Sequence, residues 1–232
     1  MLLYIIRHGE PVYTTDSLTE RGARQADALA QRLSVHGFDV IYSSPNGRAR
    51  LTAQPTCDLL NLEYKIEDWM SEDYTFRDFS REIAPGKKNW AILSQNTVYK
   101  RDAVIDADKE WHEADYLINT DAKEGYRRIQ EHSDVFLEQL GYKRENSIYK
   151  ILKNNEDRIG IFCHHVFGVM WLSYLLAIPP NLFWSSFIIS HTGVTILEFK
   201  NNPDGFTAPM CHCLSDLSHI DITEQPFTKT RS

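Results

Sequence analysis

The chain has 232 residues, 42% of them hydrophobic, and a formal net charge of −7 at pH 7. This length can bury one sizeable core, and the absence of a basic stripe excludes the usual footprint of a nucleic-acid-binding protein. No apolar run approaches the length of about 18 residues that a membrane helix needs, so we expect neither a membrane nor a nucleic acid as partner. The first residues lack the features of a signal peptide, and the four cysteines are expected to be reduced thiols, which favours a cytoplasmic protein.

Short apolar strands alternate with helices in the first part of the chain. Residues 2–6 form a continuous apolar run, which predicts a strand buried on both faces. An amphipathic helix should begin near Thr19, and Gly37 is placed to stop it. A strand at 40–44, a helix through Arg48 that Pro55 should kink or split, and a strand at 63–67 are expected next.

Residues from about 74 to 121 are rich in aromatic and charged side chains but have weak periodicity. Insertions of this length between regular elements are often lids or substrate-binding loops, so we expect a cap here. A long helix is predicted over about 122–141.

The remaining chain predicts a hairpin, a helix and a strand. The stretches 149–153 and 158–163 are joined by polar residues, which favours an antiparallel hairpin. An apolar helix through Val169 should end at Pro179, and a last strand is expected at 194–199, with an irregular tail beyond Asn201.

This alternation predicts an α/β fold for the whole chain, 1–232, as a single domain. We expect a three-layer α/β/α sandwich with a mostly parallel central sheet and an inserted, partly helical cap at about 74–121. No repeat or linker indicates two separable domains.

Polar side chains follow four of the predicted strands. Arg7 and His8 follow the first strand, Arg48 lies just past the second, Glu72 follows the third, and His164 follows the strand at 158–163. Because ligands of such sheets bind beyond the carboxyl ends of the strands, we expect these side chains to meet at one edge.

Two guanidinium groups beside two imidazoles suit a phosphate dianion. Each guanidinium offers a planar fork of donors for phosphate oxygens, whereas it would repel a metal ion, so we expect no metal and no cofactor. Positive neighbours disfavour protonation of His8, which keeps it nucleophilic. A carboxyl group, Glu72 or its neighbour Asp73, could donate a proton to the leaving oxygen and later take one from water. His164 lies at a predicted helix N-terminus, which favours an anion.

These residues stand in motifs that resemble the histidine phosphatase superfamily, also called phosphoglycerate mutase-like. The similar stretches are Arg7-His8-Gly9-Glu10, Leu18-Thr19-Glu20-Arg21-Gly22, residues 42–53 around Arg48, and Phe162-Cys163-His164. They spread over residues 2 to about 199, and the stretch from about 74 to 121 is unmatched.

The resemblance implies a metal-independent reaction through a phosphohistidine. It makes His8 the nucleophile, gives Arg7, Arg48 and His164 contacts with the phosphoryl group, and places the proton donor at Glu72. Family members often carry Thr and Asn at the positions of Pro11 and Thr14. Pro11 has no donor for phosphate, but Thr14 could still bind it.

Each role has a competing residue or a structural alternative. Arg50 competes with Arg48, His165 with His164, and Asp73 with Glu72. Cys211-His212-Cys213 resembles a metal-binding stretch, but it has no second ligand pair at suitable spacing, so we expect no zinc. His219 is expected to be a structural hydrogen-bonding residue. The basic residues of the insert are expected to form mainly a solvated face: Arg77, Arg81, Lys87 and Lys88.

The sequence therefore predicts a phosphatase of small phosphorylated metabolites. The alternatives are a phosphoglycerate mutase, which would return the phosphoryl group to the substrate, and a non-catalytic module that binds a phosphorylated ligand. The expected partner is the small substrate, and a homo-oligomer is compatible with the sequence.

Overall fold

The computed structural model describes residues 1–91 and 110–226, and its centre is a six-stranded sheet. The strand order is β13-β11-β1-β10-β4-β5, with β1, β10, β4 and β5 parallel and β11 and β13 antiparallel at one edge. The strands are β1 (Leu2–Arg7), β4 (Val40–Ser43), β5 (Tyr64–Ile66), β10 (Arg158–Cys163), β11 (Val194–Glu198) and β13 (Met210–Asp216). The predicted α/β fold with a mostly parallel sheet is confirmed.

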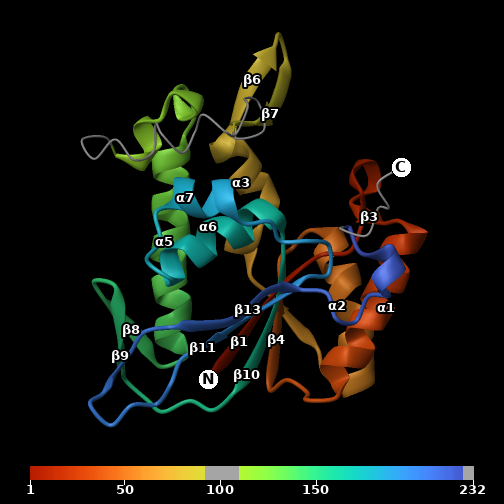
Figure 1. Ribbon diagram of the computed structural model, residues 1–232, viewed down its shortest axis with the longest axis vertical. Helices are drawn as coiled ribbons and strands as arrows, with labels where there is room; N and C mark the ends of the chain where they lie inside the picture. The colour runs from red at the N-terminus through yellow and green to blue at the C-terminus, as the bar shows by residue number, and fades with distance from the viewer. Residues whose placement is uncertain (92–109, 227–232) are drawn as a thin grey trace.

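Helices cover both faces of this sheet. Figure 1 shows helices on either side of the strands. They are α1 (Glu20–Ser34) and α2 (Gly47–Leu60) on the first side, and α5 (Ala122–Gln139) and α6 (His165–Leu175) on the second. Successive side chains of β1 point to opposite faces: Ile6 joins the core under α1 and α2, whereas Leu3 and Ile5 join the core under α5 and α6. Both layers of apolar packing therefore fix the strand that leads to His8.

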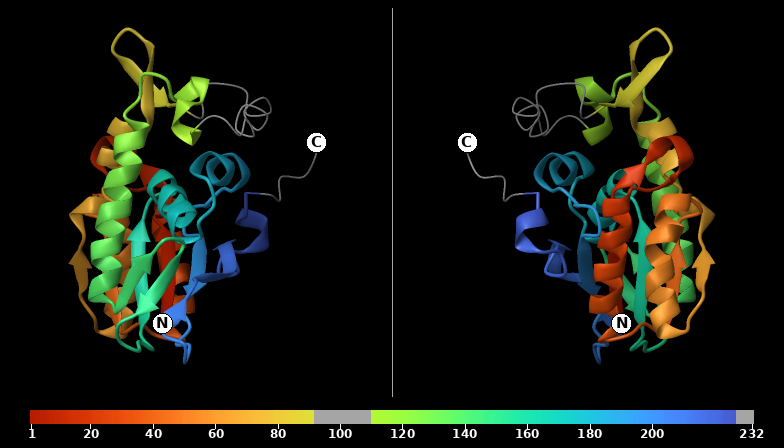
Figure 2. Two further views of the ribbon diagram at one scale, coloured as in Figure 1. Left: turned by 90° about the vertical axis from the view of Figure 1, so that its left-hand side faces the viewer. Right: turned by 90° about the vertical axis from the view of Figure 1, so that its right-hand side faces the viewer.

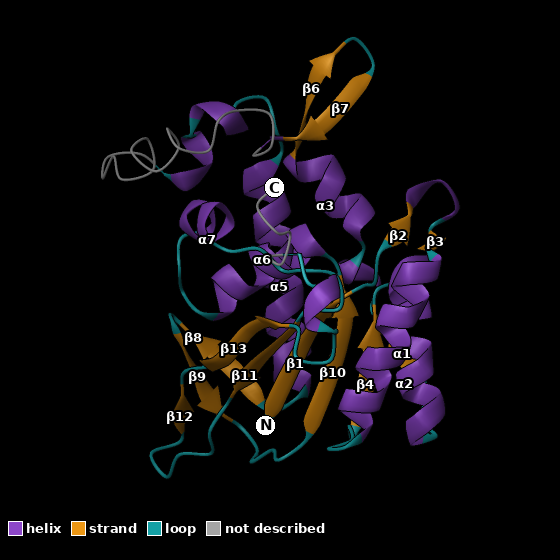
Figure 3. Ribbon diagram, turned by 45° about the vertical axis from the view of Figure 1, so that its right-hand side comes forward, coloured by secondary structure: helices purple, strands orange, loops and turns teal. Residues whose placement is uncertain are grey.

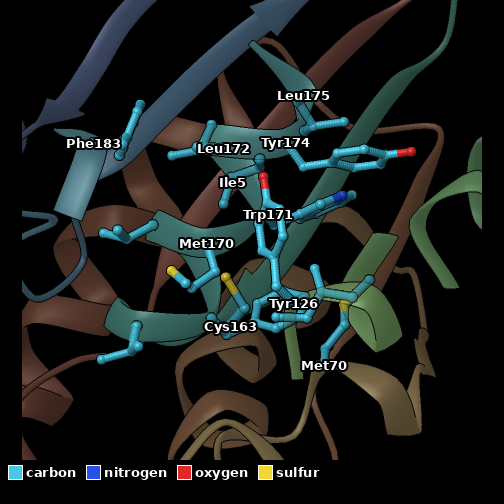
Figure 4. Close-up of a cluster of buried hydrophobic side chains, with 14 of the residues drawn as sticks. Ile5, Met70, Tyr126, Cys163, Met170, Trp171, Leu172, Tyr174, Leu175 and Phe183 are labelled. Atoms are coloured by element: carbon cyan, nitrogen blue, oxygen red, sulfur yellow. The ribbon is translucent and has the colours of Figure 1, made fainter. Parts of the chain in front are cut away.

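The larger core is centred on α6, which is apolar on nearly its whole surface and almost completely buried. Figure 4 shows Trp171 of this helix among Met70, Tyr126 and Cys163. The indole Nε1 of Trp171 donates to Ser133 Oγ at 2.7 Å, so the polar end of the ring is satisfied inside the core. No helix in the described part of the chain is long and apolar enough to cross a membrane.

The ends of the first helices follow local chemistry. Thr19 is the N-cap of α1, and its Oγ1 accepts a hydrogen bond from Gly22 N at 3.0 Å. Ala26, Leu29 and Leu33 then place one face of the helix on the sheet. The second helix contains Pro55 and continues through it, so the predicted split does not occur.

The stretch expected to form a cap begins with a helix and a hairpin. These are α3 (Glu72–Phe79), followed by β6 (Ser80–Ala84) and β7 (Lys87–Trp90). Figures 1 and 2 show the hairpin projecting beyond the sheet, at the end of the molecule opposite the N-terminus. Two short 3₁₀ helices, Trp111–Glu113 and Asp115–Leu117, end the stretch, and α7 (Pro180–Ser186) contacts the first of them. Residues 92–109 of the predicted cap lie outside the described residues.

The predicted hairpin between 149–153 and 158–163 is wrong. β9 (Ile148–Ile151) pairs instead with β8 (Tyr142–Glu145) and β12 (Phe206–Thr207), in a separate three-stranded sheet. β10 lies at the centre of the main sheet, parallel to β1 and β4. Its residues 159–163 are all buried, and such a run belongs between two neighbouring strands under helices on both faces.

The tail beyond Asn201 is not irregular as expected, because it contains β12 and β13. β13 pairs with β11 through two irregularities in register, and most of its side chains are partly exposed. A bulged edge strand lacks the alternation by which a strand is recognised in a sequence. A small two-stranded sheet, β2 (Pro11–Val12) and β3 (Ser17–Leu18), completes the regular structure of the loop after β1.

Two glycines let the loop after β1 contact the start of α1 directly. A Cβ atom added to Gly22 would lie 2.2 Å from the Glu10 carbonyl oxygen, and one added to Gly9 would lie 2.7 Å from the Gly22 carbonyl oxygen. Both neighbours are backbone atoms, so they cannot move aside as a flexible side chain would. The loop that carries His8 is therefore held against α1 at a distance that only glycine permits.

We predict that Gly22→Ala lowers the free energy of unfolding by about 2 kcal/mol, because the added methyl group must push the two backbones apart. Urea denaturation followed by circular dichroism measures the change. Arg24→Ala, at an exposed position of the same helix, is the matched control and should change stability by less than about 0.5 kcal/mol. Equal stability of Gly22→Ala and the wild type would contradict this close contact.

Candidate active site

The residues predicted to meet at the carboxyl ends of the strands do so. His8 follows β1, Arg48 lies in the first turn of α2 beyond β4, and His164 follows β10; Figure 3 shows β1, β4 and β10 side by side, with α3 beyond their ends. Glu72 is the first residue of α3. A cavity of about 430 Å³ opens here, and its lining is Arg7, His8, Tyr13, Arg48, Glu72, Asp73, Phe76, Trp90, His165, Val166 and Trp184.

His8 is buried at the floor of the cavity, with 2% of its surface exposed. Its Nδ1 lies 2.7 Å from the Gly9 carbonyl oxygen. A carbonyl oxygen only accepts, so Nδ1 carries the proton and Nε2 keeps a free lone pair. Burial, followed by the nearby charge of Arg7, lowers the pKa of His8 to about 2. The imidazole is therefore neutral at physiological pH, as a nucleophile must be.

The guanidinium group of Arg7 is hydrogen-bonded to the loop before β11. Its Nη1 donates to the Ile189 carbonyl oxygen at 2.7 Å, and its Nη2 lies 2.9 Å from Nε2 of His191. Because a guanidinium group only donates, His191 accepts through an unprotonated Nε2. Burial, with Arg7 as the next cause, lowers the pKa of His191 to about 3, which keeps this acceptor neutral. The Arg7 Nε is buried without a hydrogen-bond partner.

Arg48 is fixed by an aspartate of the first loop. Its Nη1 forms an ion pair with Asp16 Oδ1, and the other carboxylate oxygen of Asp16 accepts from Gly47 N at the start of α2. Asp16 has a left-handed backbone (φ 47°), a conformation that Asp tolerates better than most residues. Nε of Arg48 is also buried without a partner. Arg50 is exposed, so the structure brings Arg48 and not Arg50 into the cavity.

His164 completes this group of cationic and imidazole side chains. It is fully buried, and its ring centroid lies 5.2 Å from that of His8. Its Nε2 lies 2.7 Å from Ser44 Oγ, whereas Nδ1 has no partner. Arg7, Arg48 and His164 thus each keep one buried nitrogen unpaired around the same imidazole. Buried polar atoms are rarely left unpaired, and an oxyanion in the cavity would supply acceptors for the Nε atoms of Arg7 and Arg48. Ser44 Oγ donates to Asn46 Oδ1, so it accepts from His164 Nε2, and burial lowers the pKa of His164 well below its usual value. Nδ1 of the neutral His164 ring is therefore an acceptor, and it can donate to an oxyanion only when the ring is protonated.

Glu72 is the buried carboxyl group of the site. Its two oxygens accept from Val166 N and Phe167 N of α6, each at 3.2 Å. Burial raises its pKa to about 7, and these two backbone hydrogen bonds oppose that rise. A carboxyl group that titrates near neutral pH can both donate and accept a proton there. Asp73, the alternative in the sequence, is exposed and accepts from Asn46 Nδ2 at 3.3 Å.

Thr14 is not brought to the cavity. It is exposed in the short 3₁₀ helix Tyr13–Thr15 and is absent from the cavity lining. Its neighbour Tyr13 lines the cavity instead, with the guanidinium carbon of Arg48 5.6 Å from its ring centroid. His164 is absent from the cavity lining too, and lies behind it next to His8. His165, the alternative to His164, does line the cavity, and its Nδ1 accepts from Ile189 N at 3.3 Å.

The other candidates of the sequence lie outside the site. His212, between the two cysteines of the candidate metal-binding stretch, pairs with Glu198 at 2.8 Å, and the described residues contain no group of three metal-ligating side chains. His219 bonds Thr192 Oγ1 at 3.0 Å, so it contacts the loop beside His191. None of the basic residues of the insert line the cavity: Arg77, Arg81, Lys87 and Lys88.

Sequence reasoning missed four residues that hold the site together: Asp16, Ser44, Asn46 and His191. Asn46 Oδ1 accepts from Ser71 Oγ and Glu72 N, so it joins the end of β4 to the start of α3. Asn46 and Ser44 lie within the stretch that carries Arg48, so their position was a usable signal. No signal in the sequence pointed to His191. Its role depends on the antiparallel pairing of β11 with β1, which brings the start of β11 to the carboxyl ends of the parallel strands.

Comparison with known proteins identifies the family of the chain. The family model of the histidine phosphatase superfamily (branch 1) matches residues 3–208. The chain belongs to this superfamily. It is a phosphatase, a phosphoric monoester hydrolase.

The sequence identity to individual relatives is low. The chain is 25% identical over 192 residues to phosphoserine phosphatase 1 of Hydrogenobacter thermophilus. The aligned region covers 79% of this chain and 80% of that protein. Among solved structures, a phosphoserine phosphatase from Entamoeba histolytica in complex with 3-phosphoglyceric acid has a TM-score of 0.62 and 23% identity, over 94% of this chain and 98% of that one. A putative α-ribazole-5′-phosphate phosphatase from Escherichia coli has a TM-score of 0.61 and 18% identity, over 93% and 96%. These two structures share the fold with the chain.

We predict that Arg48→Ala weakens binding of orthovanadate, a phosphate analogue, by at least about ten-fold, because a charge-assisted contact of about 1.4 kcal/mol or more is lost. Isothermal titration calorimetry measures the dissociation constant. Arg50→Ala removes the same charge two residues away at an exposed position and should leave binding unchanged. Equal weakening by both substitutions would indicate a general effect of charge and would argue against the placement of Arg48.

Proposed function

We propose that the protein hydrolyses phosphate monoesters of small metabolites through a phosphohistidine on His8, without a metal ion. The observation that carries the proposal is the state of His8. It is neutral, its Nδ1 proton is held by the Gly9 carbonyl, and Nε2 is free beside two guanidinium groups. The family membership and the relationship to phosphoserine phosphatase 1 support the same reaction.

In the first step, Nε2 of His8 attacks phosphorus and the bond to the ester oxygen breaks. Glu72, in its protonated form, donates its proton to that oxygen, so a neutral alcohol leaves. The His8 imidazole becomes positively charged as the N–P bond forms, and the Gly9 carbonyl at Nδ1 stabilises this charge. Arg7 and Arg48 supply donors for the non-bridging phosphoryl oxygens, where charge must be stabilised, and His164 adds a donor at Nδ1 when the phosphoryl dianion has raised its pKa enough to protonate the ring.

In the second step, water attacks the phosphohistidine. The Glu72 carboxylate, left by the first step, takes a proton from that water as the P–N bond breaks. Inorganic phosphate is released, His8 regains its lone pair, and Glu72 is protonated again. Every group thus returns to its starting state, and the cycle consumes one ester and one water.

We predict that His8→Ala abolishes phosphate release and covalent labelling together. Rapid acid-free quenching with a ³²P-labelled ester should trap one phosphoryl group on the wild-type protein, in a bond that is stable to alkali and labile to acid. His8→Ala should carry none. Activity should be the same with and without EDTA, and its loss on chelation would overturn the metal-independent mechanism.

The same preparation separates the two alternatives when it is assayed on 3-phosphoglycerate with 2,3-bisphosphoglycerate. Isomerisation without phosphate release would establish a mutase. Vanadate binding without any turnover or labelling would establish a non-catalytic binding module. Phosphate release that disappears in His8→Ala supports the phosphatase.

A further prediction concerns pH. Glu72 must be protonated to assist departure of the alcohol, and its pKa is about 7 in the free protein. Protons are lost as pH rises, so kcat/KM for an alkyl phosphate should fall above about pH 7. His8 is neutral throughout, because its pKa of about 2 lies far below this range.

Glu72→Gln should remove this alkaline decrease and lower kcat/KM for the alkyl ester by about 10²–10⁴-fold. The loss should be much smaller for p-nitrophenyl phosphate, whose phenolate leaves without a proton. Asp73→Asn is the matched control at the neighbouring position and should retain the alkaline decrease. An equal loss on both esters in Glu72→Gln would contradict the role of Glu72 as proton donor.

A further inference from the structure

The cavity has an aromatic wall beyond the groups that face the phosphoryl group. Tyr13, Phe76, Trp90 and Trp184 all line it, and they come from four separate segments: the first loop, α3, β7 and α7. Such a concentration of rings exceeds what a small, fully charged ester can use, since its alcohol part has little apolar surface. Aromatic lining with a few placed polar groups is typical of a pocket for a flat organic body.

Three of these rings are held in place by neighbours, whereas Tyr13 is largely exposed. Phe76 meets Trp90 edge to face, with ring centroids 5.0 Å apart and an interplanar angle of 87°. Trp184 meets Phe79 in the same manner at 5.8 Å and 85°, and only 7% of its surface is exposed. Trp90 is the last residue of β7 and pairs with Ser80 of β6. A ring entering between them would contact walls that are already ordered, so little conformational entropy would be lost.

The charges of the same wall favour an uncharged alcohol. Among the described lining residues, Arg7 and Arg48 are the only guanidinium or ammonium groups, and both lie beside His8. Apart from these two groups, His8, Glu72 and the Tyr13 hydroxyl, the polar lining residues are Asp73 and His165. A carboxylate at the position of Asp73 would repel a second anion. His165 is neutral, since burial lowers its pKa to about 4, and its Nδ1 accepts from Ile189 N, so its proton lies on Nε2.

We propose that the substrate is a phosphate monoester whose alcohol carries an aromatic or flat apolar body and has no second anionic group. This inference rests on the proposed phosphatase function and names its substrate class. The phosphoryl group lies on His8 between the two guanidinium groups, and the body of the alcohol packs on Trp90 and Trp184. Esters with a carboxylate on the alcohol, such as phosphoserine and 3-phosphoglycerate, are then poor substrates.

Three esters of primary alcohols test this, because their leaving groups have similar basicity: 2-phenylethyl phosphate, ethyl phosphate and 3-phosphonooxypropanoate. We expect kcat/KM for the phenylethyl ester to exceed that for ethyl phosphate by at least about ten-fold, the range that apolar contacts give in specificity. The carboxylate ester should fall below ethyl phosphate. Equal values for all three, or a preference for the carboxylate ester, would overturn the proposal.

Variants locate the preference. Trp90→Ala should reduce the ratio of kcat/KM between the phenylethyl and ethyl esters several-fold, and a ratio is insensitive to partial loss of folded protein. Trp111→Ala removes an indole that lies outside the cavity lining and should keep the ratio. Asp73→Asn should raise kcat/KM for the carboxylate ester relative to ethyl phosphate. An unchanged ratio in Trp90→Ala would show that the aromatic wall does not contact the alcohol.

A binding measurement separates this inference from the proposed function. 3-Phenylpropylphosphonate and propylphosphonate resemble the first two esters but cannot be hydrolysed. If no ester is hydrolysed while calorimetry still shows at least about ten-fold tighter binding of the phenyl compound, the hydrolytic function fails and the ligand class stands. If esters are hydrolysed without a phenyl preference in either assay, the function stands and the ligand class fails.

Discussion

The hydrogen bond from His8 Nδ1 to the Gly9 carbonyl fixes which nitrogen faces the cavity, and the remaining site is arranged around that choice. The bond requires the loop after β1 to keep one shape. Gly9 and Gly22 allow this loop to touch α1, Gly9 N donates to Thr52 Oγ1 of α2, and His8 N donates to the Cys163 carbonyl of β10. The imidazole is thus tied to both helices of one layer and to the neighbouring strand. A rotation that exchanged its two nitrogens would leave a buried N–H facing no acceptor, at a cost of about 1–3 kcal/mol.

The second constraint is electrostatic. Burial first, and the charge of Arg7 next, lower the pKa values of His8 and His191 and keep both rings neutral, which preserves the lone pair of His8 and the acceptor on His191. Asp16 balances Arg48 only in part, because its carboxylate also binds the start of α2. An incoming phosphoryl dianion would complete the compensation and, by its own charge, raise the pKa of Glu72 above its value in the free protein. Binding of the ester therefore favours the protonated form of Glu72 that the first step needs, and departure of the alcohol leaves the carboxylate that the second step needs.

The sequence predicted well the parts that depend on local patterns. The continuous apolar run before Arg7, the Thr19 cap and the spacing of residues that follow strands placed the candidate residues at the edge of the sheet where the structure brings them together. The predictions were wrong where a strand pairs with strands that are distant in the sequence. β10 pairs with β1 and β4, and no local feature distinguishes that from a hairpin with β9. The expected phosphate contact of Thr14 is not supported for a related reason. The conformation of the 3₁₀ turn determines which of the two adjacent side chains enters the cavity, and Tyr13 enters it instead.

The two ends of the cavity come from different parts of the fold. The groups around the phosphoryl position follow the strands of the sheet, whereas the aromatic wall comes from segments outside it: the first loop, the cap and α7. The first loop and the cap hairpin can change with little effect on the core, so specificity can vary while the chemistry is kept, whereas Trp184 of α7 also belongs to the larger core. Helix α3 is the exception, because Glu72 and Phe76 lie one turn apart on it. A shift of this helix that adapted the wall to another alcohol would also move the proton donor, which must stay within reach of the ester oxygen. The position of α3 is therefore set by both demands. Asn46, the N-cap residue of α2 just beyond β4, accepts from Glu72 N and holds the start of α3 against the end of the sheet.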